Sequence, residues 1–292
     1  MPRPLHILCP PRFSFVTINL LMLMMGMQCM LSAQSQPVLI GYKPDSIGSA
    51  QRISEIRSLS NEVFKPYSFT DSKGIEVHYR LFSPEKLPAG STTFPLIVVF
   101  HGSGQIGTDN AAQLGLLPKL FANAEIQRTY PAYVLAPQFS TRSSDYSMDS
   151  SRHVLASAPR SCLNTALTLI DSLIRYLPID RNRIYVVGYS MGASTTINAL
   201  SARPNFFAAG ISIAGIPQFD RGREIMHVPL WLIHGLKDDV NAIDSDLRFF
   251  QEFNRRNLLF WQLQNTNHDI LTSPALLGTA LPDWLFKQKR VL

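Results

Sequence analysis

The sequence predicts an α/β fold, in which a mostly parallel central sheet carries helices on both faces. Short segments that are apolar at nearly every position recur along the chain, as in strands that are buried on both faces. Segments with apolar residues at helical spacing separate them. This alternation is typical of a parallel sheet covered by helices. The length of 292 residues, with 46% hydrophobic and 16% charged residues, fits one globular domain or two small ones, and excludes disordered, collagenous and polytopic membrane proteins.

The first segment, residues 1–33, has the pattern of a secretory signal. Arg3 and Arg12 precede a strongly apolar stretch, 13–31, which ends in a small pair closed by Ala33. A positive start, an apolar core and small residues at the end are typical of a cleaved signal peptide. We therefore expect cleavage after Ala33 and a secreted or periplasmic protein that is not stably inserted in a membrane.

Two alternatives to a cleaved signal stay open for this segment. The first is an uncleaved membrane anchor. Such an anchor needs a longer uninterrupted apolar stretch, whereas polar residues interrupt this one. A lipid anchor requires modification of Cys29, but Gln28 precedes it where such sites have a small residue. Cys162 is the only cysteine beyond the segment, so we expect neither a disulfide framework nor a zinc site.

The chain after the signal divides into an N-terminal extension, 34–68, and a main domain, 69–292. The extension is polar and expected to be irregular to about Leu59. Residues 75–82 alternate in polarity and predict an edge strand or hairpin arm. Buried strands are expected at 96–100, 132–136, 184–187, 209–213, 230–233 and 258–263. Helices are expected at 163–174, 191–202, 242–253 and 281–288.

Two connections between these elements bear on access to a site. Only residues 214–227 separate the strand at 209–213 from the next, which is too few for a helical lid, so we expect no large cap domain. The longest segment without a predicted element is 139–160, which is rich in Ser, Asp and Arg. Loops of this length are often functional. We expect it either as one wall of a substrate pocket or as a mobile surface insertion.

A Gly-x-Ser-x-Gly motif, from Gly188 to Gly192, lies between the strand at 184–187 and the helix at 191–202. At so tight a turn, a side chain at either glycine would collide with neighbouring backbone, while the central serine is held exposed. In this context the motif predicts a nucleophile elbow with Ser190 as the nucleophile. The alternative is a glycine-rich turn whose serine only caps the helix.

Candidates for an acid and a base follow the next strands. Asp238 and Asp239 come shortly after the strand at 230–233, and His268 lies in a polar loop after the last strand. A nucleophilic serine needs a base that takes its proton and an acid that orients the base, here in the chain order serine, acid, histidine. We assign His268 as the base and favour Asp238 as the acid, with Asp239 as the alternative.

A second glycine turn, from His101 to Gly104, follows the strand at 96–100. Attack of a nucleophile on a carbonyl group creates an oxyanion, which backbone N–H groups stabilise. We assign these donors to the N–H groups of Ser103 and of Met191, the residue after the nucleophile. The alternative is a turn without a part in catalysis.

The other histidines are expected to have no part in catalysis. His101 and His234 each begin a His-Gly step directly after a strand, and we expect both to brace loop backbone and to stay neutral. His78, His153 and His227 are expected to be surface or satisfied residues. None of these histidines has a carboxylate or serine partner within a motif.

These motifs together resemble serine esterases and predicted peptidases of the α/β-hydrolase superfamily, close to the branch of polyhydroxybutyrate depolymerases and of feruloyl and acetyl-xylan esterases. The resemblance spans about residue 69 to the C-terminus. It rests on 101–110, 134–138, 179–185, 188–192, 234–239 and 283–289. It implies the α/β-hydrolase fold, a catalytic domain over 69–292, and Ser190, Asp238 and His268 as a triad.

The chain departs from the pattern of this family at three positions. Ala193 stands where many relatives have a second glycine, Asn241 replaces a proline common after the acid, and Asn267 precedes the base where glycine is usual. None of these changes removes a chemical group that the reaction needs. They leave the geometry of the acid loop and the substrate branch open.

Three functions from different classes follow. The first is a secreted hydrolase that cleaves bulky or carbohydrate-linked carboxylic esters through an acyl-Ser190 intermediate, since an exported enzyme without a lid admits large substrates. The second is a peptidase or amidase that uses the same triad. The third is a non-catalytic binding module, which is disfavoured because all three triad residue types are present in order.

Charge and motif content exclude other partners. The formal net charge is +6, but the basic residues are scattered rather than clustered, so we expect no nucleic-acid partner. The sequence has no nucleotide-binding glycine fingerprint and no cluster of metal ligands, so we expect neither a cofactor nor a metal.

Overall fold

The computed structural model describes residues 35–41, 46–85 and 90–290. The predicted signal, its cleavage after Ala33 and the lipid alternative at Cys29 lie outside the described residues. The chain from Ser35 onward clusters into one compact unit. No helix in the described ranges is long and apolar enough to cross a membrane.

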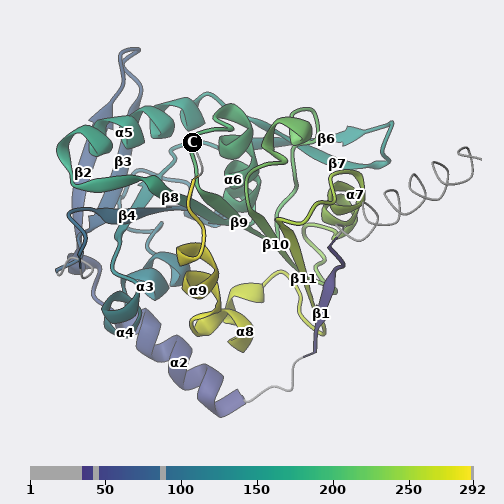
Figure 1. The fold of residues 1–292 in the computed structure, drawn as a ribbon, viewed down its shortest axis with the longest axis horizontal. Helices are drawn as coiled ribbons and strands as arrows, with labels where there is room; N and C mark the ends of the chain where they lie inside the picture. Colours follow the sequence, from purple (N-terminus) through teal and green to yellow (C-terminus); the bar gives the residue numbers. More distant parts are fainter. Residues whose placement is uncertain (1–34, 42–45, 86–89, 291–292) are drawn as a thin grey trace, which may run out of the picture. The chain divides into compact units, whose positions relative to one another are not determined.

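A nine-stranded sheet lies at the centre of this unit, in the order β1-β11-β10-β9-β8-β4-β5-β3-β2 (Figure 1). Neighbouring strands are parallel from β1 to β5 along this order, and β3 and β2 are added antiparallel at one edge. The strands are β1 (Val38–Ile40), β2 (Phe64–Thr70), β3 (Glu76–Phe82), β4 (Phe94–Phe100), β5 (Tyr133–Gln138), β8 (Ile179–Tyr189), β9 (Ala209–Ile213), β10 (Leu230–Gly235) and β11 (Leu258–Leu263). The buried strands predicted from the sequence are all present, and β3 forms a hairpin with β2 as expected.

Helices cover both faces of the sheet, as the sequence predicts (Figure 1). One face carries α5 (Cys162–Tyr176), α6 (Met191–Ala202) and α7 (Asp244–Glu252). The other carries α2 (Ser46–Ser58), α3 (Leu116–Ala122), α4 (Ala124–Thr129), α8 (Pro274–Leu277) and α9 (Ala280–Phe286). This is the architecture of the α/β-hydrolase fold, and only the 3-10 helix Gly222–Ile225 lies between β9 and β10, where a cap is often inserted.

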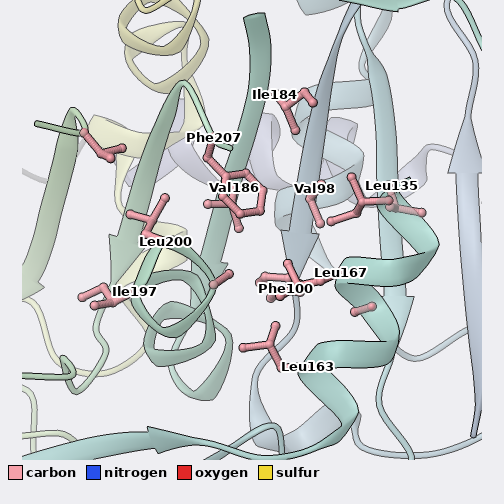
Figure 2. Packing of buried hydrophobic residues seen from close by; sticks show 14 of the residues in the cluster. Val98, Phe100, Leu135, Leu163, Leu167, Ile184, Val186, Ile197, Leu200 and Phe207 are labelled. Atoms are coloured by element: carbon pink, nitrogen blue, oxygen red, sulfur yellow. The ribbon is translucent and has the colours of Figure 1, made fainter. Parts of the chain in front are cut away.

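The strands are apolar at nearly every position because their side chains alternate between two cores. On β4, Leu96, Val98 and Phe100 belong to the core under α5, α6 and α7, while Ile97 and Val99 belong to the opposite core. Figure 2 shows the first of these cores, in which side chains of the central strands meet those of α5 and α6. Two-sided burial holds the strand ends, and therefore the loops after them, in fixed positions.

The expectation of an irregular extension up to Leu59 is wrong. β1 adds to β11 at one edge of the sheet, and α2 packs its buried Ile56 against the α3 side of the molecule. β2, which includes residues on both sides of the predicted boundary at 69, forms the other edge of the same sheet. The two strands bury little side-chain surface, so backbone pairing stabilises them and polarity gives little sign of it.

The expectation that 139–160 is irregular is also wrong. The segment forms a two-stranded antiparallel hairpin of β6 (Ser144–Asp149) and β7 (Val154–Pro159). Its polar composition reflects how it is attached, because Ser143 and Ser144 each share a hydrogen bond with Thr195 of α6, at 2.7 and 3.0 Å. At its tip, Arg152 forms a bidentate pair with Glu252 of α7, with both distances 2.8 Å.

Candidate active site

Ser190 lies at the turn between β8 and α6 in a strained backbone conformation, with φ 55° and ψ −120°. A Cβ atom at Gly188 would lie 2.0 Å from the carbonyl oxygen of Gly192, and one at Gly192 would lie 2.1 Å from that of Phe100. Neither contact is sterically possible, so both glycines are required by the turn. The backbone N–H of Ser190 donates to the carbonyl of Ile213 on the neighbouring strand at 2.9 Å, which anchors the turn to the sheet.

The structure brings Ser190, His268 and Asp238 together from three different loops. The Ser190 hydroxyl lies 2.9 Å from His268 Nε2, and His268 Nδ1 lies 2.8 Å from Asp238 Oδ2 and 3.0 Å from Oδ1. Tyr189 supports the histidine loop by donating to the carbonyl oxygen of His268 at 2.8 Å and by placing its ring 5.2 Å from the imidazole. The arrangement fits a proton transfer from the serine to a histidine that a carboxylate orients.

The loop after β10 holds the Asp238 carboxylate in place. The N–H groups of Val240 and Asn241 donate to Asp238 Oδ1 at 3.0 and 2.9 Å. Burial opposes ionisation of this carboxyl, but the hydrogen bonds from His234, His268 and the two N–H groups outweigh it and hold its pKa below the usual range. Of the two acids that the sequence offered, it is Asp238 that contacts His268, while the Asp239 side chain is exposed.

Two backbone N–H groups beside Ser190 have no acceptor among the described residues. Met191 is the first residue of α6, and Ser103 is the first residue of the 3-10 helix Ser103–Gln105, so neither has an intrahelical partner. The turn that carries Ser103 lies against the nucleophile, because a Cβ atom at Gly102 would be 3.5 Å from Ser190 Cβ. Free donors at this place suit the stabilisation of an oxyanion.

His101 braces loop backbone, as the sequence predicts. Its Nδ1 lies 2.7 Å from the carbonyl oxygen of Gly102, and its Nε2 accepts from the N–H of Phe139 at 2.9 Å. These partners require the neutral form with hydrogen on Nδ1. The hydrogen bond to Gly102 favours the charged form, but burial outweighs it and lowers the pKa of His101. The lowered pKa also favours the neutral form.

The expectation that His234 is neutral and lacks a carboxylate partner is wrong. Its Nδ1 lies 2.7 Å from Oδ2 of Asp246 on α7, and its Nε2 lies 2.7 Å from the carbonyl oxygen of Asn241 and 3.3 Å from Asp238 Oδ2. Burial opposes the charge, but the two carboxylates raise the pKa of His234 to about 10. Asp246 is the residue near the site that the sequence analysis missed, since it belongs to no motif.

Across residues 35–41, 46–85 and 90–290, no group of three or more His, Cys, Asp or Glu side chains is placed to hold a metal ion.

Comparisons with known proteins agree with this fold. No family model matches the chain. Among curated proteins, acetylxylan esterase A of Emericella nidulans is 32% identical over 94 residues, which are 32% of this chain and 31% of that protein. A bifunctional acetylxylan esterase/xylanase of Neocallimastix patriciarum is 35% identical over 72 residues, 25% of this chain and 11% of that protein. The matches thus span less than a third of each relative.

Solved structures resemble the chain over a longer range. A thermostable esterase superposes with a TM-score of 0.70 and 28% identity, covering 78% of this chain and 64% of its own. A CE1 ferulic acid esterase of Anaeromyces mucronatus has a TM-score of 0.52 at 13% identity, covering 73% and 88%, which shows the shared fold. The chain has the α/β-hydrolase fold, and it resembles esterases of that fold in both sequence and structure.

Proposed function

We propose that the protein is a serine hydrolase that cleaves carboxylic esters through an acyl-Ser190 intermediate. The observation that carries the proposal is the continuous hydrogen-bonded path from Ser190 through His268 to Asp238, with both contacts of the imidazole at 2.9 Å or less. The likeness to esterases supports an ester as the substrate.

In the proposed reaction, Ser190 Oγ bonds to the carbonyl carbon of the ester as its proton passes to His268 Nε2. The N–H groups of Ser103 and Met191 stabilise the oxyanion, helped by the N-terminus of α6. Collapse breaks the bond to the alcohol, which leaves with the proton from His268. Water, deprotonated by His268, then attacks the acyl-serine, releases the carboxylic acid and restores Ser190.

We propose bulky or carbohydrate-linked esters as the substrate class. Two features support it: the curated relatives with matching segments are acetylxylan esterases, and the connection between β9 and β10 holds no helical lid. The β6–β7 hairpin is attached near the nucleophile, since Tyr146 lies 3.2 Å from Ser194, one helical turn after Ser190. We propose that it forms one wall of the substrate pocket. Acetylated xylan is then expected to be a better substrate than an emulsified triacylglycerol.

Turnover of 4-nitrophenyl acetate and of 4-nitroacetanilide tests the reaction class. The ester is expected to give a stoichiometric burst of nitrophenol followed by slower turnover, and Ser190→Ala is expected to lower kcat by about a millionfold. Ser54→Ala, at an exposed serine of α2 on the opposite face of the sheet, is the matched control and is expected to keep the activity. Equal turnover of the anilide would instead favour an amidase or peptidase. No Ser190-dependent turnover of either compound would contradict the proposal and favour a binding module.

We also propose that the protein is exported and that residues 1–33 are removed as a signal peptide. The charge and apolar pattern of that segment supports the proposal. Expression of the full chain, followed by fractionation and N-terminal sequencing, tests it. A mature protein that begins at Gln34 is expected, and an intact N-terminus in the membrane fraction would contradict it.

A further inference from the structure

Behind Asp238, a buried histidine and a buried aspartate extend the triad through an ion-pair contact and a further hydrogen bond. His234, at the end of β10, lies between Asp238 and Asp246, with N···O distances of 3.3 and 2.7 Å. The side chains of all three residues are fully buried. The path therefore runs from Ser190 at the surface of the site to Asp246 on α7, through two imidazoles and two carboxylates.

The partners of His234 determine where its protons lie. The carbonyl oxygen of Asn241, 2.7 Å from Nε2, only accepts, so Nε2 carries a hydrogen. Nδ1 faces a carboxylate oxygen of Asp246 at 2.7 Å, and this contact also contains a proton. Burial raises the pKa of the Asp246 carboxyl, against the lowering effect of His234 and of its place in the first turn of α7. The pKa of His234 is raised to about 10 by its two carboxylate partners, so we place the proton on His234.

The charged groups around His234 come from two elements. Asp246 faces it from α7, and Asp238 faces it from the loop after β10. Beyond Asp238, His268 faces the same carboxylate from the loop after β11. An imidazolium at His234 thus lies closer to Asp238 than the negative charge of Asp246 does. The net effect of the pair on Asp238 is that of a nearby positive charge.

We propose that His234 is a positioning residue of the hydrolase, held as an imidazolium by Asp246, and that it orients the Asp238 carboxylate and favours its ionised form. The inference rests on the proposed function of the triad. It assigns to α7, which contributes no residue to the triad, a defined part in the reaction.

A cation behind Asp238 has a consequence for the pH dependence. It opposes the binding of an additional proton by the hydrogen-bonded pair of Asp238 and His268, so the pair keeps the charge state that the reaction needs. Removal of the cation is expected to move the acid limb of the kcat/KM profile to higher pH. If His234 contributed only to stability, its loss would lower the melting temperature without moving this limb.

Asp246→Asn removes the charge with the smallest change in shape. An asparagine amide can donate to Nδ1 of a neutral His234, which keeps its Nε2 hydrogen on the carbonyl of Asn241. The acid limb is expected to rise by about one pH unit, and kcat to fall about tenfold at neutral pH with little change in KM. Asp244→Asn, the same change at an exposed position of α7, is the control and is expected to leave the profile unchanged. An unchanged limb in Asp246→Asn would overturn the proposal.

Two further measurements keep the proposal testable if Asp246→Asn does not fold or no ester is cleaved. Nitrogen-15 NMR of the wild-type histidines is expected to show both ring nitrogens of His234 protonated at pH 8, and a neutral imidazole there would overturn the proposal. The pH profile of the rate at which a fluorophosphonate labels Ser190 is expected to show the same shift of its acid limb in Asp246→Asn. His234→Gln replaces that variant if it does not fold. Failure of the wild-type protein to label contradicts the proposed function, whereas labelling with an unshifted pH dependence in the variant contradicts the role of His234.

Discussion

His101 and His234 occupy matching places in the fold but differ in protonation state. Each is the first residue of a His-Gly step at the carboxyl end of a parallel strand, β4 or β10, and each is buried, with 6% and 0% exposure. His101 has two backbone partners and is neutral, whereas His234 lies between the carboxylates of Asp238 and Asp246 and is charged. The side chains that other elements bring to a histidine, rather than its position in a motif, determine its protonation state.

The two steps also differ in how they serve the site. The His101 turn contributes backbone N–H groups. A neutral His101 that holds the backbone of the turn in place is sufficient there. The His234 loop offers a carboxylate, Asp238, which must stay ionised although it is buried, and a neighbouring cation favours that state. Variants that exchange or remove these features test how far the comparison holds.

The largest effect is expected from Asp238, the residue that connects the His234 loop to the reaction. Asp238→Asn cannot accept the Nδ1 hydrogen of His268 in the same way, and kcat is expected to fall about ten-thousandfold, as for the loss of a triad acid. Steady-state hydrolysis of 4-nitrophenyl acetate measures it. Asp239→Asn, one residue away and exposed, is the control. A larger loss in Asp239→Asn would mean that the wrong acid has been assigned.

Smaller effects, unequal in size, are expected at the two glycines of these steps. A Cβ atom at Gly235 would lie 2.3 Å from the carbonyl oxygen of Thr266, in the loop that carries His268, whereas one at Gly102 would meet nothing nearer than the flexible end of Gln105 at 3.3 Å. Gly235→Ala is therefore expected to lower the free energy of unfolding by about 1–3 kcal/mol. Gly102→Ala is expected to cost less than about 1 kcal/mol. Urea unfolding compares them, and equal losses would contradict the difference between the two turns.

The smallest effects are expected in the pH dependence of stability, with opposite signs. The pKa of His234 is raised from 6.5 to about 10 on folding, so its contribution to stability is complete below pH 6.5 and is lost as the pH rises through 10. The pKa of His101 is lowered from 6.5 by burial, so its contribution is present above pH 6.5 and is lost as the pH falls below it.

His234→Gln is thus expected to reduce the change of the melting temperature with pH between pH 7 and 10. His101→Gln is expected to reduce that change between pH 7 and 5. Each kcal/mol corresponds to about 2–4 °C in a chain of this size. Differential scanning calorimetry at the three pH values measures both changes. A reduced pH dependence of the melting temperature on the same side of pH 7 in both variants would show that the two histidines do not differ in charge.

The sequence was informative wherever short-range physics decides the structure. The strands at 209–213 and 258–263 have the predicted limits, because two-sided burial requires an uninterrupted apolar run. Glycine at 188 follows from a steric contact with Gly192 within the turn, whereas glycine at 192 is required by Phe100 at the end of β4. The three-residue edge strand β1 and the separate β6–β7 hairpin bury few side chains, so hydrophobic patterning did not reveal them, and the predictions of irregular segments were wrong.

Patterns in the sequence were enough to predict the α/β architecture, the turn that holds Ser190 and the loops in which Asp238 and His268 lie. Packing in three dimensions shows which of two adjacent acids contacts His268, and it places His234 between two carboxylates. Helical spacing places Asp246 on the same face of α7 as the buried Phe249 and Phe250, but that spacing does not identify its partner. Periodicity acts between residues that are near in sequence, whereas the protonation of a buried group depends on charges that only packing brings near in space.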